Sequence, residues 1–128
     1  MALRFVDPDA TTTAEVDGVK FTIGYWPPRE AERVEALRAA LRKCPNKDTE
    51  EARGIGLEVH LAMVEYGVRA FDGQPADAFV RETVRGIEYT RVSSKVLRQL
   101  YINDAIWPLG VACLQWNELS ELEKKVSG

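Results

Sequence analysis

The segment from Asp48 to Phe71 constrains the fold most, because it carries two apolar stripes on opposite faces of one predicted helix. The first stripe consists of Ala52, Ile55, Val59, Met63, Tyr66 and Ala70, and the second of Leu57, Leu61, Val64, Val68 and Phe71. Spacings of three and four residues place each set along one line of a helix, and positions 55 and 57 lie roughly 200° apart. A surface helix needs only one such stripe. We therefore expect this helix to be covered on two sides, by the rest of its own domain or by another chain.

The length and composition are those of one globular domain. The chain has 128 residues, of which 45% are hydrophobic and 29% are charged. Such a chain can bury a sizeable core without disulfides or metals. We predict a single domain over residues 1–128, with a β-hairpin region at 1–26 and a helical region at 28–128. The expected fold class is α+β, mainly α, with the N-terminal hairpin packed on a bundle of about four helices.

The charge balance argues against a general attraction to nucleic acid or to anionic membranes, because 17 basic residues face 20 acidic ones and the net charge is −3. No apolar run reaches the roughly 18 residues that a membrane span needs, and the N-terminus lacks the apolar core of a signal peptide. Cys44 and Cys113 lie within apolar helical patterns, which favours reduced thiols that pack as small hydrophobes. We expect a cytoplasmic protein that does not bind a membrane, and nucleic acid is the less favoured partner.

Residues Thr12 to Tyr25 read as a β-hairpin that turns at Asp17-Gly18. The two-residue loop fixes the pairs Val16 with Val19, Ala14 with Phe21 and Thr12 with Ile23 on one face, and Glu15 with Lys20 and Thr13 with Thr22 on the other. Two strands alone are marginal in water. Either Leu3 to Val6 adds a third strand or a helix covers the apolar face.

Helix signals divide the rest of the chain. Pro28 is expected in the first turn of a helix that Pro45 stops, with a core stripe at Ala31, Val34, Leu37, Leu41 and Cys44. Asp48 or Thr49 caps the two-striped helix, and Ser93 or Ser94 caps a third. Pro108 begins or kinks a fourth, with Leu109, Cys113, Leu114 and Trp116 on its core side. Residues Gln74 to Tyr89 are assigned to loop, with short strands at Phe79 to Val84 and Ile87 to Tyr89, or one short helix, as alternatives.

The sequence holds no pattern typical of catalysis. His60 is the only histidine, and the positions three and four residues later hold Met63 and Val64, so no metal or acid–base partner follows it. Gly54-Ile55-Gly56 lacks the preceding strand and third glycine of a dinucleotide-binding loop. We therefore expect no enzyme activity, no cofactor and no metal.

One cluster of positive charge supports an alternative function. If residues 91–98 were helical, Arg91, Lys95 and Arg98 would line one face and could bind an anion, as in a small nucleic-acid-binding or regulatory module. The other interpretation is a solvated face opposite Val92 and Val96. We favour the solvated face, because the chain as a whole is acidic.

Apolar and aromatic side chains are the candidates for binding a protein partner. Trp26 stands at a predicted strand end beside two prolines, where partial exposure is expected. The second stripe of the long helix supplies Leu57, Leu61, Val64, Val68 and Phe71. These six residues form the predicted protein-binding set, and a second copy of the chain is an alternative partner for it.

Three passages resemble small tail assembly proteins of bacteriophages and prophages, especially the tail assembly chaperones. The first is Val16 to Ile23 (VDGVKFTI), which leads into a charged helix. The second is Val64 to Gly73 (VEYGVRAFDG), although Ala70 and Phe71 stand where that family has a tryptophan. The third is Trp116 to Lys125 (WNELSELEKK), which is similar to the ending of such proteins.

The resemblance implies a non-catalytic protein in the cytoplasm of a bacterial host. Such a protein would bind the long helical tape-measure protein, or other phage tail components, and keep them soluble during tail assembly. A helix with two apolar faces suits that role.

Overall fold

The computed structural model describes residues 7 and 9–127, with the side chains of all these except Val84 and residues 119–127. The elements in chain order are β1 (Thr11–Val16), β2 (Val19–Gly24), α1 (Pro28–Lys43), α2 (Glu50–Gly67), β3 (Val68–Phe71), β4 (Phe79–Val84), β5 (Ile87–Val92), α3 (Ser94–Ile102) and α4 (Ile106–Ser127). The predicted class, α+β and mainly α with an N-terminal hairpin followed by helices, is confirmed. The expected strand at Leu3 to Val6 lies outside the described residues.

The β1–β2 hairpin has the predicted register at every pair, from Val16 opposite Val19 to Thr12 opposite Ile23. Asp17 and Gly18 both adopt positive φ, 52° and 78°. This is the backbone that a two-residue hairpin turn requires, and aspartate and glycine adopt it at little cost. The local turn chemistry therefore fixes the register without help from the rest of the chain.

The prediction of one helix through Phe71 is wrong at its end. α2 stops at Gly67, and Val68 to Phe71 forms β3, which pairs antiparallel with β2 to complete a sheet of order β1-β2-β3. The pairing brings Phe71 opposite Phe21, with a bulge between Thr22 and Ile23. The edge of β2 offers backbone hydrogen bonds that only the tertiary fold makes available, and they outweigh the helical periodicity of the sequence.

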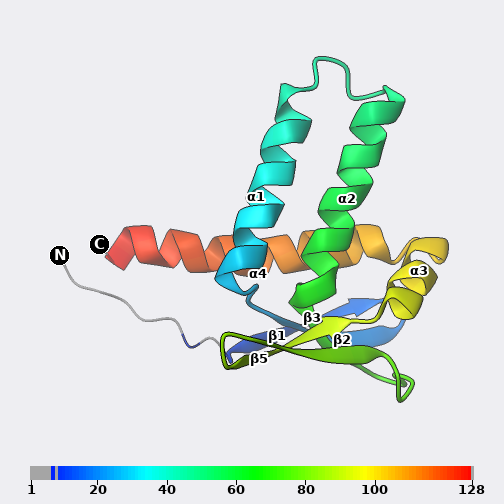
Figure 1. Cartoon of the computed structure of the whole chain (residues 1–128), viewed down its shortest axis with the longest axis vertical. Helices are drawn as coiled ribbons and strands as arrows, with labels where there is room; N and C mark the ends of the chain where they lie inside the picture. Colours follow the sequence, from blue (N-terminus) through cyan, green and yellow to red (C-terminus); the bar gives the residue numbers. More distant parts are fainter. Residues whose placement is uncertain (1–6, 8, 128) are drawn as a thin grey trace.

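α1 and α2 form an antiparallel helical hairpin that stands out from the rest of the molecule (Figure 1). Pro28 is the first residue of α1, as predicted, and the helix ends at Lys43. Thr49 caps α2, its hydroxyl oxygen accepting from the Ala52 N–H at 3.1 Å. Because only the lower part of the hairpin meets other elements, its outer end is covered by the two helices alone.

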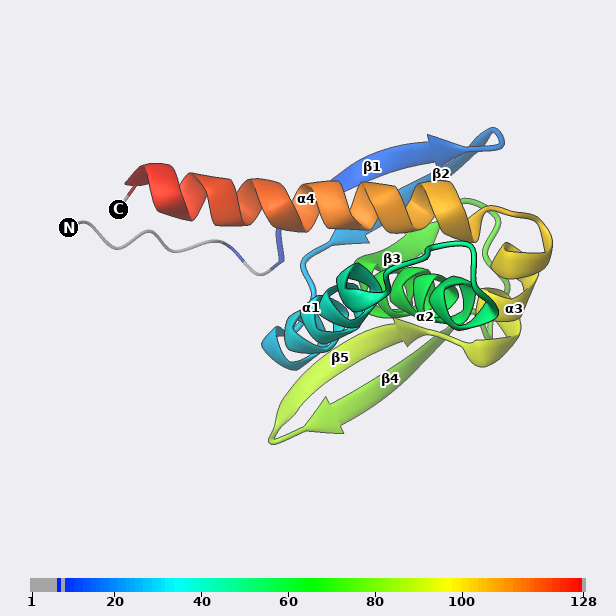
Figure 2. The same cartoon turned by 90° about the horizontal axis from the view of Figure 1, so that it is seen from above.

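α4 runs across the base of this hairpin and over the β1–β2 ribbon (Figure 2). It begins at Ile106, two residues before Pro108, so the proline lies in the first turn. A methyl group placed on Gly67 would lie 2.6 Å from Cys113 Sγ, and one on Gly110 would lie 2.6 Å from His60 Cδ2. The two glycines thus allow the close crossing of α2 and α4.

The assignment of residues Gln74 to Tyr89 to loop is wrong and the alternative of short strands is confirmed, because β4 and β5 form a second antiparallel hairpin there. Its turn is Arg85-Gly86, with φ of 52° and 80°. The predicted helical region at 28–128 therefore also contains three strands. In Figure 2 this ribbon lies on the opposite side of α1 and α2 from α4.

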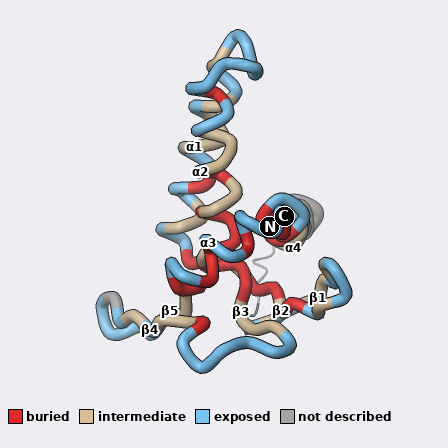
Figure 3. Tube along the Cα trace, turned by 90° about the vertical axis from the view of Figure 1, so that its right-hand side faces the viewer, coloured by how far each residue is buried: buried red, intermediate tan, exposed pale blue. Residues whose placement is uncertain are grey.

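Both stripes of α2 are covered at the base of the hairpin. Val59 and Met63 of the first stripe and Val64 of the second are buried, and α1, α3, α4, β2 and β5 all contact the helix. Towards the outer end, Ile55 and Leu57 are only half-buried. Figure 3 shows mostly intermediate and exposed residues in this part of the hairpin. The two-sided burial expected from the sequence is thus supplied within this chain, but only for half of the helix.

Candidate protein-binding surface

Exposed apolar side chains gather at the corner where α3 turns into α4. Among the side chains that the structure describes, five large apolar ones are exposed, and four of them belong to this corner. The four, between 37% and 60% exposed, are Tyr101, Ile102, Trp107 and Val111. The fifth, Ile87, lies beside the β4–β5 turn. We refer to the four residues as the corner patch.

A tight turn at Asp104 builds the corner patch. Asp104 adopts a φ of 59°, and the Ala105 N–H donates to the Leu100 carbonyl at 2.9 Å, which closes the end of α3 in the manner of a Schellman motif. The turn places the Tyr101 and Trp107 rings 6.5 Å apart in an edge-on arrangement. Residues from two different helices thereby form one surface.

α2 packs against the corner patch through His60. The His60 ring meets Trp107 edge-on, with ring centroids 4.8 Å apart. His60 Nδ1 donates to the Gly56 carbonyl at 2.9 Å, which orients the imidazole. The indole is therefore held in place while more than a third of it stays exposed. Ordered, exposed aromatic rings are typical of protein-binding hot spots.

The predicted protein-binding residues of the second stripe, which lie in α2 and β3, divide into a buried and a half-buried group. Val64 and Val68 are fully buried inside this chain. Leu57 and Leu61 are half-buried, and Leu57 lies one turn before His60, so helical spacing places it beside the histidine that touches the corner patch. Phe71 is half-buried in β3 between Phe21 and Phe79.

Trp26 is half-buried, and two hydrogen bonds fix its position. Its indole N–H donates to the Met63 carbonyl at 2.8 Å, and its backbone N–H donates to Asn117 Oδ1 at 3.0 Å. These bonds connect the strand end with α2 and with α4. The residue anchors three elements to one another.

The three cations of the alternative site do not share one helix face. Arg91 lies in β5, whereas Lys95 and Arg98 lie in α3. Arg91 donates to Glu82, and this bond lowers the pKa of the Glu82 carboxyl and raises that of the Arg91 guanidinium. Lys95 Nζ lies 3.4 Å from Asp77 Oδ2. Two of the three charges are thus paired with carboxylates.

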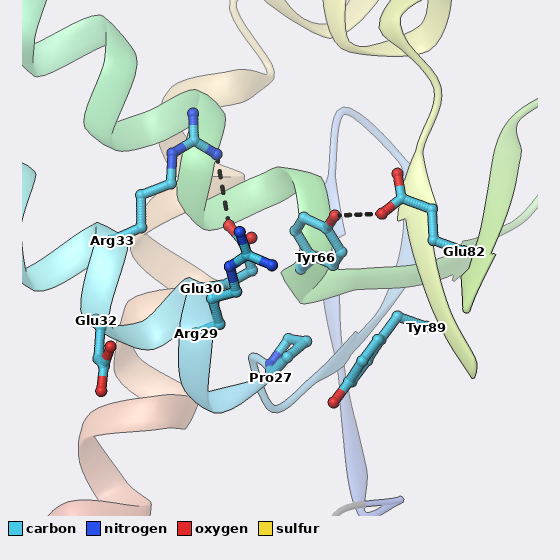
Figure 4. A pocket seen from close by; sticks show the side chains of 8 residues that line it. All are labelled: Pro27, Arg29, Glu30, Glu32, Arg33, Tyr66, Glu82 and Tyr89. Atoms are coloured by element: carbon cyan, nitrogen blue, oxygen red, sulfur yellow. Dashed lines mark hydrogen bonds and ion pairs between the residues drawn. The ribbon is translucent and has the colours of Figure 1, made fainter. Parts of the chain in front are cut away.

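A pocket of about 560 Å³ lies between the start of α1 and the β4–β5 ribbon (Figure 4). Tyr66 and Tyr89 line one side, and the Tyr66 hydroxyl donates to Glu82 Oε2 at 3.0 Å. Burial, and then the bond to Glu82, raises the pKa of Tyr66 to about 12. Pro27, Arg29, Glu30, Glu32 and Arg33 complete the lining with Glu82. With charges of both signs around the pocket, electrostatics alone selects no ligand.

The described part of the chain offers few groups for metal binding or nucleophilic catalysis. No group of three or more histidine, cysteine, aspartate or glutamate residues in it is placed to hold a metal ion. Both cysteines are unbridged, and burial raises the pKa of the Cys113 thiol to about 12, which leaves it a neutral packing group. Among the described helices, none combines the length and the hydrophobicity that a membrane span requires.

Sequence reasoning missed the corner patch, although its spacing carried a signal. Trp107 and Val111 are four residues apart on the side of α4 opposite the buried Leu109 and Cys113. Two large apolar residues on the side of a helix that points away from its core indicate a contact surface. The pocket gave no such signal, because Glu82 and Tyr89 fall in the segment assigned to loop.

No protein-family model, curated protein or solved structure matches this chain.

Proposed function

We propose that the chain is a non-catalytic, chaperone-like phage tail assembly protein that binds another tail component, such as a tape-measure protein, in the cytoplasm of a bacterial host. The corner patch is the observation that carries the proposal. It leaves an ordered apolar surface in water, where one chain alone gains nothing from it. The resemblance of the three sequence passages to tail assembly proteins supplies the class of partner.

The chemistry of the corner patch fits a helical partner. Tyr101, Trp107 and Val111 present two rings and a branched side chain, and the half-buried Leu57 lies on α2 one turn from His60, which contacts Trp107. An amphipathic helix offers a stripe of apolar side chains at spacings of three and four residues, and docking buries both surfaces. Covering such stripes before assembly is what would keep a long helical protein soluble.

The nucleic-acid alternative has less support from the geometry. Arg91 and Lys95 are paired with Glu82 and Asp77, so binding phosphate would first break these contacts. Large exposed apolar side chains, by contrast, gather at the corner patch. A protein partner therefore suits the described surface better.

Coexpression with the tape-measure protein of the same phage genome tests the proposal. The complex should copurify, and the double variant Trp107→Ser/Val111→Ser should bind about thirtyfold more weakly, as expected for the loss of a hot spot. Ile87→Ser is the matched control, because Ile87 is as exposed but lies on the β4–β5 ribbon.

Two results would count against the proposal. If the tape-measure protein stays soluble and unbound in the presence of this chain, the assigned partner is wrong. If Ile87→Ser weakens the complex as much as the double variant does, the corner patch is not the binding surface.

A further inference from the structure

The outer edge of β1 carries backbone groups that no described strand pairs. β1 lies at the margin of the β1-β2-β3 sheet, and its only strand partner among the described residues is β2. Figure 3 shows β1 at the outer side of the sheet, with α4 above the part nearer β2. The edge runs for the six residues from Thr11 to Val16. No strand within the described residues therefore occupies this edge.

The hairpin register shows which groups point outward. In a hairpin closed by a two-residue turn, the flanking residues Val16 and Val19 form a hydrogen-bonded pair, and such pairs alternate along the ribbon. The backbone N–H and C=O groups of Thr12, Ala14 and Val16 thus face β2. Those of Thr11, Thr13 and Glu15 face away from it.

The usual protection of an edge strand is missing here. Between Thr11 and Val16 there is no proline, no lysine and no bulge, which are the features that natural proteins use to block edges. The only charge, on Glu15, is opposite Lys20 on β2. β4, the comparable edge of the other hairpin, carries Arg81 and Glu82 instead.

We propose that β1 pairs antiparallel with β1 of a second copy of this chain, about a two-fold axis through Thr13, to form a continuous six-stranded sheet. The proposal is independent of the function proposed above. In this register Thr13 stands opposite Thr13 of the second copy, and Thr11 stands opposite Glu15. The outward groups of Thr11, Thr13 and Glu15 then form about six hydrogen bonds.

The side chains match in the same register. A threonine pair at the axis is favourable across antiparallel strands, and each Glu15 carboxylate meets a Thr11 hydroxyl and not a second carboxylate. The two glutamates stand four residues apart along the strand, or roughly 14 Å at 3.4 Å per residue. Self-pairing therefore creates no like-charge contact, which favours a second copy over a partner of unrelated sequence.

Register-specific crosslinking tests the proposal on the full chain. In a Cys44→Ser background, which removes the more exposed native thiol, Thr13→Cys should form a disulfide-linked dimer on mild oxidation, because residues opposite each other at the axis are within bridging distance. Thr11→Cys alone should stay unlinked. The Thr11→Cys/Glu15→Cys double variant should link again.

Sedimentation gives the matching equilibrium measurement. The unmodified chain should show a monomer–dimer equilibrium, and Thr13→Pro should raise its dissociation constant about thirtyfold, because one outward donor is lost from each copy while the bonds to β2 remain. Thr83→Pro is the control at an outward, exposed position of β4 and should leave the constant unchanged. A chain that is monomeric throughout, or that crosslinks through position 11 alone, would overturn the proposal.

Discussion

The two halves of α2 show how far the same kind of helix can differ in burial. From Val59 to Gly67 most residues are buried between α1, α4 and the strands, whereas from Glu50 to Glu58 only Ala52 is buried. Both halves carry the same two apolar stripes in the sequence. The difference shows that a two-sided pattern predicts where a helix can be covered, and that neighbouring elements decide where it is covered.

The two halves of α2 also differ in role, because the inner half stabilises the fold and the region next to it is available to a partner. The inner half supplies the core and anchors Trp26 and α4, so its side chains are unavailable to a partner. The boundary between the halves lies at Leu57 to Leu61, beside the corner patch. A partner that docks there would extend the coverage of α2 outward from the core.

Truncating one apolar side chain in each half should give the largest contrast. Met63→Ala is expected to lower the free energy of unfolding by about 3 kcal/mol, because Met63 is 2% exposed and a cavity would remain. Leu57→Ala should cost about 1 kcal/mol, because its side chain is already half in water. Urea denaturation measures both. Equal losses would mean that the outer half is as well packed as the inner half.

Adding a methyl group should change the free energy of unfolding in opposite directions in the two halves of α2. Gly67→Ala is expected to cost about 2 kcal/mol, because the new group would lie 2.6 Å from Cys113 Sγ and 3.0 Å from Trp26 Nε1. Gly54→Ala meets nothing within 4 Å, so the gain in helix propensity should stabilise the protein by up to about 1 kcal/mol. Thermal unfolding followed by circular dichroism would show the two opposite shifts. Destabilisation by Gly54→Ala would contradict an open outer half.

The contact of the inner half with β4 should depend on pH. The hydrogen bonds from Arg91 and Tyr66 lower the pKa of Glu82 below the ordinary value of 4.5, so its ionised form stabilises the fold at neutral pH. This contribution is present above the ordinary carboxyl pKa and is lost as the pH falls through the lowered one. Glu82→Gln should therefore cost less than about 1 kcal/mol at pH 7 and still less in acid.

Glu88→Gln is the control for this pH effect. Glu88 pairs with Arg81 on the same ribbon at 3.5 Å, but both side chains are more than half exposed. Its replacement should leave the pH dependence of unfolding close to that of the unmodified chain. If both variants change that dependence alike, the contact of Glu82 with Tyr66 is not the cause of the pH effect.

Sequence patterns predicted those elements whose determinants are local. The Asp17-Gly18 turn and the caps at Thr49 and Ser93 lie within a few residues of what they determine, and all three appear in the structure. β3 could not be predicted in this way, because its pairing partner β2 lies far away in the chain and the helical periodicity continues through Val68. The helix at 28–43 was predicted because its end signals are local, with Pro28 at its start and Pro45 just after its end.

The second hairpin and the corner patch depend on residues in unusual backbone conformations. Arg85 and Asp104 adopt φ of 52° and 59°, and neither is the glycine or asparagine that turn rules favour most. The turn at Asp104 brings Tyr101 close to Trp107, and no sequence pattern predicted that turn. The spacing of Trp107 and Val111 could have indicated half of the patch, but the other half required the tertiary structure.

The smallest effect is expected from the exposed ion pairs along α1. Glu35 accepts a hydrogen bond from Arg42 at 2.8 Å and lies 3.5 Å from Arg38, yet the Glu35 and Arg42 side chains are 58% and 59% exposed. Water screens such pairs, so Glu35→Gln should cost only about 0.3 kcal/mol, and this loss should vanish in 1 M salt. A double-mutant cycle with Arg42→Gln isolates the pair. A coupling above about 1 kcal/mol would show that an exposed ion pair on α1 contributes as much to stability as the half-buried Leu57 in the outer half of α2.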